Sequence, residues 1–421
     1  MSTTTRPTLP GFDPLSPEFL LDPFPTWARA QQECPVFFYP EMNFWVLTRR
    51  EDVLRAVTDY KTFSSRAVGT VPPPAELADR VPKDFFHDSF VAIDPPEHTV
   101  SRKAANSGFT RPRIEAMQRT ILQIANELID DFIDDGHCDL MEQYCYQLSL
   151  RTIVRMLGLE DGEEYLARYR QWTEDMFSLL TPKGAETDNA ARPMADQEWR
   201  ERWGRIADAV AYYRGLIESR RKHATDDLIS VLVHTTTEDG SPALSDDKII
   251  THIQEMIAAG NDTTANLMGS LVLYLSQQPE DWAELKANPE LLPGAVEEGL
   301  RRRGSSIGMF RVTTQDVIVS GVEIEKGSMV FLGFQAAGHD PEQFSDPRHV
   351  DIRRENADEH LSFGRGRHFC MGAPLARLEA RLGLQTLFAR IPDLDVVPDQ
   401  PIEFAPTMTV SMLQHLAVVW N

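Results

Sequence analysis

The chain has 421 residues, of which 42% are hydrophobic and 25% charged, a composition typical of a globular protein with a large core. Its 64 acidic residues outnumber its 42 basic residues, and the net charge of −22 disfavours a nucleic-acid partner because a polyanion would be repelled. The first ten residues lack the apolar core of a signal peptide, and no run of about 18 apolar residues follows. We therefore expect a cytoplasmic protein with no membrane partner.

Cysteine usage indicates the same compartment. Cys34, Cys138, Cys145 and Cys370 are few and irregularly spaced for a chain of this length. This pattern does not suggest a disulfide framework, so we expect reduced thiols in a reducing compartment.

The first third of the chain is predicted to mix short strands with helices. Residues 35–48 predict two strands joined by a turn, residues 50–58 a helix, and residues 60–93 a proline-rich irregular stretch. Apolar residues then recur at helical spacing from Pro112 until Gly136 ends the pattern.

The rest of the chain is predicted to be mainly α-helical with small β elements. The longest predicted helix begins after Ser245, a good N-cap residue, and ends before Pro279. Strands joined by glycine-bearing turns are predicted within residues 317–332. Because the motifs described below need one shared site, we expect a single domain over residues 1–421. Further predicted helices cover residues 139–157, 160–180, 195–223 and about 290–302, with a polar loop at residues 181–189.

The segment Phe363–Gly372 surrounds Cys370 with small residues. Gly364 and Gly366 permit positive φ angles, so this loop can curl around the cysteine and aim backbone N–H groups at its sulfur. A helix is predicted directly after the loop, with Pro374 in its first turn. The positive end of the helix dipole favours the thiolate, which suits a metal ligand.

Taken alone, Cys370 has other interpretations. A lone cysteine in a globular protein is usually a small buried apolar residue. Zinc would need four ligands, and neither a CxxC nor an HxxxH pattern lies nearby.

A second motif, Ala259–Thr264, lies inside the longest predicted helix. Glycine and threonine are poor helix formers, so this segment either packs closely against a neighbouring helix or lets a flat cofactor lie against Ala259 and Gly260. Thr263 could bond back to a backbone carbonyl and open a small kink. At such a groove, the acid Asp262 beside an alcohol could pass protons from water.

Two pairs of polar residues are informative only because of their position in the chain relative to the other motifs. Glu298 and Arg301 are three residues apart, and His98 and Arg102 are four apart, so each pair would share one helix face. Taken alone, such pairs usually decorate solvated faces.

In this order, the motifs resemble those of the cytochrome P450 family, and the resemblance covers about residues 11–419. It implies the cytochrome P450 fold, a triangular, helix-rich single domain with small β-sheets in which haem lies between the long central helix and the cysteine loop. Cys370 is then the axial thiolate ligand of the haem iron, Phe363 shields the sulfur, and His368 reaches a haem propionate.

The resemblance assigns further roles around the haem. Asp262 and Thr263 match the family's acid–alcohol pair, which delivers protons for the reduction of O₂. The haem-contacting set that it implies is His98, Arg102, Ala259, Gly260, Arg311, Phe363, Gly364, His368, Cys370 and Gly372.

Glu298 and Arg301 match a structural ion pair of the family that a later arginine completes. Our candidate for this third member is Arg353, with its neighbour Arg354 as the alternative. The family often continues with an aromatic residue and a proline, whereas the segment 302–308 contains two further arginines, two glycines and no proline. We expect this departure to change the start of a strand beside the pocket. It would then affect which substrate shape the pocket accepts, but not the chemistry of the reaction.

The implied substrate pocket is apolar and suits a terpenoid, an aromatic or a similar hydrophobic small molecule. By resemblance it is walled by residues 60–93 and 170–190, the long helix, and residues 307–310 and 407–412. Each lining candidate is also compatible with ordinary core packing. The candidates are Phe85, Phe86, Phe90, Phe177, Met256, Ala259, Ile307, Met309, Phe310 and Met408.

The resemblance implies an enzyme, a haem-thiolate monooxygenase that hydroxylates, O-dealkylates or epoxidises its substrate. It would use haem b, O₂ and two electrons from NAD(P)H, delivered by a separate ferredoxin and ferredoxin reductase because no flavin or iron–sulfur motif is present. We expect a monomer with a local basic docking face for the ferredoxin. The residues of this face are Arg102, Lys103, Arg365, Arg367, Arg377 and Arg381.

Two other functions are weighed against this one. An H₂O₂-driven peroxygenase of the same fold has little need of an acid–alcohol pair. A non-catalytic haem sensor or electron carrier needs neither that pair nor a substrate pocket. Asp262 and Thr263 therefore favour the O₂-dependent monooxygenase.

Overall fold

The computed structural model describes residues 6–182 and 195–421, which form two compact units. The predicted single domain stays a prediction, and residues 183–189 of the predicted polar loop lie outside the described residues. The first unit comprises Met1–Ser64, Gln118–Ser149 and Asn261–Asn421, and the second comprises Ser65–Met117 and Leu150–Gly260.

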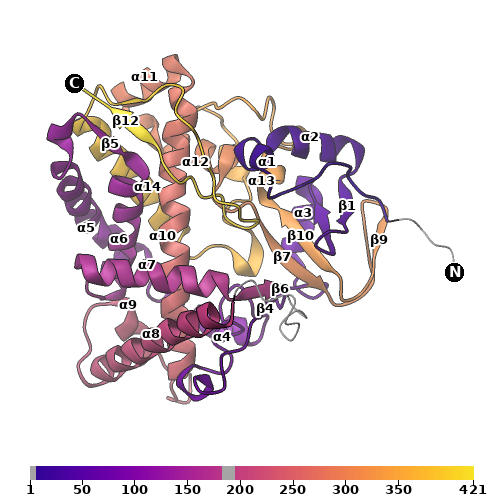
Figure 1. Cartoon of the computed structure of the whole chain (residues 1–421), viewed down its shortest axis with the longest axis vertical. Helices are drawn as coiled ribbons and strands as arrows, with labels where there is room; N and C mark the ends of the chain where they lie inside the picture. The colour runs from indigo at the N-terminus through magenta and orange to yellow at the C-terminus, as the bar shows by residue number, and fades with distance from the viewer. Residues whose placement is uncertain (1–5, 183–194) are drawn as a thin grey trace. The chain divides into compact units, whose positions relative to one another are not determined.

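A five-stranded sheet lies within the first unit (Figure 1). Its strand order is β1-β2-β10-β7-β3, and all neighbours are antiparallel except β2 and β10, which are parallel. The strands are β1 (Val36–Tyr39), β2 (Phe44–Leu47), β10 (Met329–Gly333), β7 (Gly308–Thr313) and β3 (Phe63–Ser64).

Both faces of this sheet are buried because successive side chains enter two different apolar clusters. Phe37 and Phe331 belong to a mainly aromatic cluster that includes residues of α1 and α2. Val36 and Val330, their neighbours in sequence, belong to the second cluster, which includes residues of α3. The flanking helices are α1 (Pro17–Leu21), α2 (Phe24–Glu33) and α3 (Arg50–Thr58).

The remaining elements of the first unit include four helices, one of which follows the cysteine loop. A three-stranded sheet has the order β11-β12-β5, and β8 pairs with β9. The helices are α11 (Pro279–Ala287), α12 (Leu292–Arg303), α13 (Phe334–Gly338) and α14 (Ala373–Arg390). The strands are β5 (His137–Asp139), β8 (Val317–Val319), β9 (Val322–Ile324), β11 (Asp395–Val396) and β12 (Ala417–Val419).

The second unit is mainly helical and contains one two-stranded sheet, β4 with β6. Its elements are α4 (Glu97–Asn106), α7 (Glu163–Ser178), α8 (Asp196–Lys222), α9 (Leu228–His234), β4 (Val68–Thr70) and β6 (Leu180–Pro182). Three helices contain residues of both units, α5 (Arg111–Asp130), α6 (Tyr146–Leu157) and α10 (Asp246–Ser276). A π-helical turn, Met141–Cys145, precedes α6. No helix among the described residues is both long and apolar enough to cross a membrane.

Local signals in the sequence correctly predicted several helix ends. The Lys248 N–H donates to the Ser245 hydroxyl at 3.3 Å, so Ser245 caps α10 as expected. Gly136 adopts a left-handed φ of 71°, which ends the helical segment before it. Pro279 follows α10, but it also opens α11, which the sequence did not predict, because proline loses no hydrogen bond in a first helical turn.

Glu379 is a buried acid on α14, only 2% exposed. Burial raises its pKa from an ordinary 4.5 to about 8, because a carboxylate loses more solvation than a neutral acid on leaving water. Between these values the folded chain keeps a proton that the unfolded chain has lost. Glu379 therefore lowers the stability of the fold progressively as the pH rises from 4.5 to about 8.

Replacing this acid with its neutral isostere should remove that loss. We expect Glu379→Gln to raise the free energy of unfolding at about pH 8 by on the order of 2–4 kcal/mol, and by much less at about pH 5. Urea unfolding of wild type and variant across this pH range measures the difference. Glu323→Gln, at an exposed position on β9, is the control, and parallel wild-type and Glu379→Gln profiles would contradict the prediction.

Candidate functional site

The loop that carries Cys370 is closed by its own backbone. The Cys370 N–H donates to the Phe363 oxygen at 2.9 Å, and the Gly364 N–H donates to the Leu361 oxygen at 2.8 Å. Gly364 and Gly366 have φ angles of 66° and 70°, in the left-handed region, as predicted. α14 begins three residues after the half-buried cysteine, so Cys370 lies near the positive end of an 18-residue helix.

The loop approaches α12 closely. The Ser362 hydroxyl donates to the backbone oxygen of Leu300 at 2.6 Å. A Cβ atom at Gly304 would lie only 2.1 Å from the Ser362 Oγ atom. Gly304, which departs from the family pattern, is therefore needed here because a side chain would collide with Ser362.

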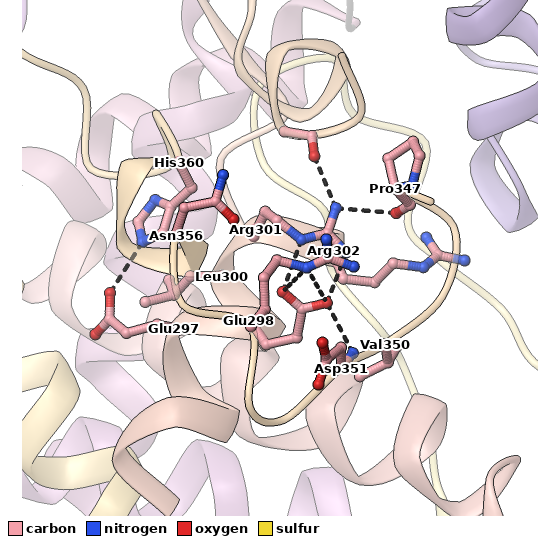
Figure 2. Close-up of polar contacts among 12 residues, drawn as sticks. Glu297, Glu298, Leu300, Arg301, Arg302, Pro347, Val350, Asp351, Asn356 and His360 are labelled. Atoms are coloured by element: carbon pink, nitrogen blue, oxygen red, sulfur yellow. Dashed lines mark hydrogen bonds and ion pairs between the residues drawn. The ribbon is translucent and has the colours of Figure 1, made fainter. Parts of the chain in front are cut away.

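The Glu298 carboxylate lies at the centre of a buried ionic cluster (Figure 2). Arg301, one turn along α12, donates to both of its oxygens at 2.7 Å. The Asp351 N–H donates to it at 3.0 Å, and Arg354 donates through Nε at 3.1 and 3.2 Å. Arg301 also donates to the backbone oxygen of Pro347 at 2.9 Å, so the cluster joins α12 to the segment around residues 347–354.

The prediction that Arg353 is the third member of this cluster was wrong. The alternative, Arg354, occupies this position. Arg353 instead pairs with Glu284 on α11, where both side chains are substantially exposed. The side chain of Arg354 is only 6% exposed and also donates to the Ser345 oxygen at 2.7 Å. Adjacent residues in an irregular segment project differently, so the sequence could not distinguish these two arginines.

The centre of α10 contains a short accessible stretch within a buried helix. Ala259 is exposed and Gly260, Asp262 and Thr263 are partly exposed, whereas residues 264–273 are all buried. Small side chains over such a stretch leave room beside the backbone for a flat group. This observation fits the predicted role of these residues in cofactor binding.

Close packing independently accounts for Gly260. A Cβ atom at this position would lie 3.0 Å from the Cγ1 atom of Ile153 on α6. This contact supports the first explanation offered for this glycine from the sequence, and its place beside a flat cofactor stays a prediction. α10 continues as an uninterrupted helix through Thr263.

Two polar side chains hold the predicted acid–alcohol pair. The Asn261 side-chain amide donates to the Asp262 carboxylate at 3.0 Å. The Ser305 hydroxyl donates to the backbone oxygen of Thr263 at 2.5 Å. Ser305 lies in the segment 302–308, which contains no proline, and the sequence did not predict a role for it. Only the fold brings it to α10.

The candidate haem-propionate residues lie in both units. In the second unit, His98 is 2% exposed and Arg102 is partly buried, and both lie on α4. In the first unit, Arg311 on β7 is 3% exposed and donates to the Phe310 oxygen at 2.8 Å. His368 lies in the cysteine loop and is partly exposed. Their assignment to haem stays a prediction.

The candidate pocket residues differ in their surroundings. In the second unit, Phe85, Phe86, Phe90 and Met256 are buried, whereas Phe177 is exposed. The Phe90 ring stacks on His252 with a centroid distance of 3.7 Å. In the first unit, Ile307, Phe310 and Met408 pack with the mainly aromatic cluster on one face of the sheet. Met309 packs against the cluster on the opposite face.

The candidate docking residues are not all available to a partner. Arg377 is bound in a two-point ion pair with Glu297, with distances of 2.5 and 2.8 Å. Arg365 donates to the Asp358 oxygen, whereas Arg367 is exposed and lies 5.0 Å from the Tyr60 ring centre.

The two additional arginines of the segment 302–308, which departs from the family pattern, bind the N-terminal helices. Arg302 lies 3.9 Å from the Phe24 ring centre and 4.8 Å from that of Tyr274. Arg303 donates to the backbone oxygens of Leu20 and Leu21 at 2.5 and 2.8 Å. Both side chains are buried, so this segment joins α12 to the junction of α1 and α2.

Comparisons with known proteins agree with this fold. A family model described as Cytochrome P450 matches residues 42–414. The chain is 33% identical over 427 residues to cytochrome P450 monooxygenase PikC of Streptomyces venezuelae, covering 100% of this chain and 96% of PikC. It is 34% identical over 401 residues to vitamin D(3) 25-hydroxylase of Pseudonocardia autotrophica, covering 94% and 92% of the two chains.

The structure is also similar to a solved one, that of cytochrome P450 CREJ in complex with (4-ethylphenyl) dihydrogen phosphate. The TM-score is 0.85 with 27% sequence identity, over 98% of this chain and 99% of the other. The predicted mainly helical fold with small sheets is thus confirmed. The chain belongs to the cytochrome P450 family and is an oxidoreductase of its monooxygenase class.

Proposed function

We propose that this protein is a haem-thiolate monooxygenase that uses O₂ and two external electrons to hydroxylate a small hydrophobic molecule. The observation that carries the proposal is the placement of Cys370. It lies in a loop shaped by two left-handed glycines, directly before a long helix, in a chain of the cytochrome P450 family. The helix dipole and the surrounding backbone favour a cysteine that stays a thiolate.

The haem that family membership implies would be held from several sides. Cys370 would ligate its iron, and Ala259 and Gly260 would lie beside its flat face, where accessible small residues interrupt the buried surface of α10. When bound, the haem supplies the activation of O₂. The candidate propionate donors, His98, Arg102, Arg311 and His368, are four groups for two carboxylates, a plausible number.

Asp262 and Thr263 would move protons during turnover. The Asp262 carboxyl exchanges protons with water, and the neighbouring Thr263 hydroxyl passes them on toward O₂. Asn261 steadies the carboxylate of Asp262, and Ser305 steadies the backbone of Thr263. A peroxygenase or a haem sensor would not need protons delivered in this way.

The substrate is proposed to be a small hydrophobic molecule. The apolar side chains of the candidate lining residues support a hydrophobic substrate, and one similar protein is named for hydroxylation of vitamin D(3), a hydrophobic molecule. Hydroxylation is the reaction we favour, with O-dealkylation and epoxidation by the same chemistry as alternatives.

The absorption spectrum of the reduced protein with carbon monoxide tests thiolate ligation directly. We expect a strongly red-shifted Soret band in the wild type and its loss in Cys370→Ser. Cys138→Ser, which changes another cysteine of the chain, is the control and should keep the band. A haem-loaded wild type without the shift would rule out the proposed ligand.

Removal of the alcohol tests the proton pathway. We expect Thr263→Ala to keep consuming O₂ and reductant but to form several-fold less product per O₂. The reason is that the hydroxyl that passes protons toward O₂ would be missing. Thr264→Ala, at the neighbouring buried position, is the matched control. Oxygen electrode and product assays give the ratio, and a fully coupled Thr263→Ala would exclude the role. Turnover driven by H₂O₂ better than by O₂ with reductant would favour the peroxygenase.

Electrons are proposed to come from NAD(P)H through a separate ferredoxin and its reductase, with exposed Arg367 at the docking face. We expect Arg367→Glu to slow haem reduction by a reduced ferredoxin several-fold at low salt without loss of haem. Lys326→Glu, which makes the same charge change at an exposed turn, is the control. Stopped-flow traces measure the rate, and equal rates for both variants would remove Arg367 from the docking face.

A further inference from the structure

A second carboxylate on α12, that of Glu297, belongs to a different cluster from its neighbour Glu298. Figure 2 shows the Glu297–His360 pair separate from the Glu298 cluster. Glu297 accepts hydrogen bonds from His360 Nε2 at 3.3 Å and from Arg377 at 2.5 and 2.8 Å. Burial alone would raise its pKa, but the hydrogen bonds from Arg377 and His360 lower the pKa to about 2, so the group stays ionised in the folded protein.

The two partners of Glu297 lie on either side of Cys370 in the sequence. His360 precedes the cysteine by ten residues, and Arg377 follows it by seven, on the second turn of α14. One carboxylate on α12 therefore holds both the segment that leads into the cysteine loop and the helix that leaves it.

The protonation of His360 follows from its contacts. Its Nδ1 atom accepts a hydrogen bond from the Ser362 N–H at 3.1 Å, so its proton lies on Nε2, which faces Glu297. Burial lowers the pKa of His360, and Glu297 offsets this only in part. A neutral imidazole therefore donates to the carboxylate, and Ser362 adds a second tie to α12 through the Leu300 oxygen.

Arg377 connects Glu297 to the cysteine through Phe363. Its guanidinium lies 4.7 Å from the centre of the Phe363 ring, within the range of a cation–π contact. The same ring lies 5.7 Å from that of His360. The Phe363 oxygen in turn accepts the N–H of Cys370 at 2.9 Å, so every step from Glu297 to the cysteine is a direct contact.

We propose that Glu297 is a positioning residue for the Cys370 thiolate: through His360 and Arg377 it holds Phe363, and with it the cysteine loop, in the ligating geometry. This inference rests on the proposed function, since it requires Cys370 to be the haem ligand. Glu297 has a second effect, because its negative charge cancels that of Arg377 close to the thiolate. Removing it would leave an uncompensated positive charge, which favours the reduced haem.

The two effects can be separated with three variants. Glu297→Gln removes the charge and weakens both hydrogen bonds, Glu297→Asp keeps the charge but shortens the reach, and Glu297→Gln combined with Arg377→Gln restores the local net charge without restoring the geometry. Glu284→Gln is the matched control, because it breaks an exposed pair with Arg353 on α11.

Two measurements on haem-loaded protein provide the readout. The first is the rate at which the carbon monoxide complex loses its red-shifted band on mild heating, below the global unfolding transition followed by circular dichroism. The second is the reduction potential of the haem, which a merely structural role for Glu297 would not move. We expect Glu297→Gln to lose the band several-fold faster than wild type and to have a more positive potential.

The double variant should lose the band as fast as Glu297→Gln while its potential returns toward that of wild type. Glu297→Asp should fall between wild type and Glu297→Gln in rate, and it carries the test if Glu297→Gln does not fold. Equal rates of band loss for wild type, the control and the Glu297 variants would overturn the inference and leave the proposed function intact. A wild type without the red-shifted band would instead overturn the proposed function.

Discussion

The region around Cys370 depends on the neutralisation of one buried charge. Glu298 is fully excluded from water, and an ion in that position costs several kcal/mol unless its partners satisfy it. Arg301 and Arg354 supply these partners, the first from the same helix and the second from a segment some fifty residues further on. Satisfying the carboxylate therefore fixes that later segment against α12, and the cysteine loop begins nine residues after it, at Phe363.

α12 distributes its polar side chains among several parts of the first unit. Glu298 binds the segment around residues 347–354, and Glu297 binds α14 and the segment that leads into the cysteine loop. Arg302 and Arg303 contact α1 and α2. The helix ends in three arginines, and its composition alone would therefore suggest an exposed helix. Nine of its twelve residues are nevertheless buried. Its charges are partnered by other segments rather than by water.

The sequence predicted those features that depend on near neighbours in the chain. The Ser245 cap, the left-handed glycines of the cysteine loop and the family motifs all belong to this group. It could not choose between Arg353 and Arg354, and it assigned no role to Glu297. Both the choice of Arg354 and the role of Glu297 depend on partners that are distant in sequence.

The attachment of the N-terminal helices has a consequence for how the protein responds to its medium. Arg302 and Arg303 bind aromatic rings and backbone oxygens rather than carboxylates, and their guanidinium groups are buried. Burial lowers the pKa of Arg302 only to about 10, so it stays charged at neutral pH. Salt screens exposed ion pairs but scarcely reaches such buried contacts. The contacts of Arg302 and Arg303 therefore hold the N-terminal segment in a manner that ionic strength leaves largely unchanged.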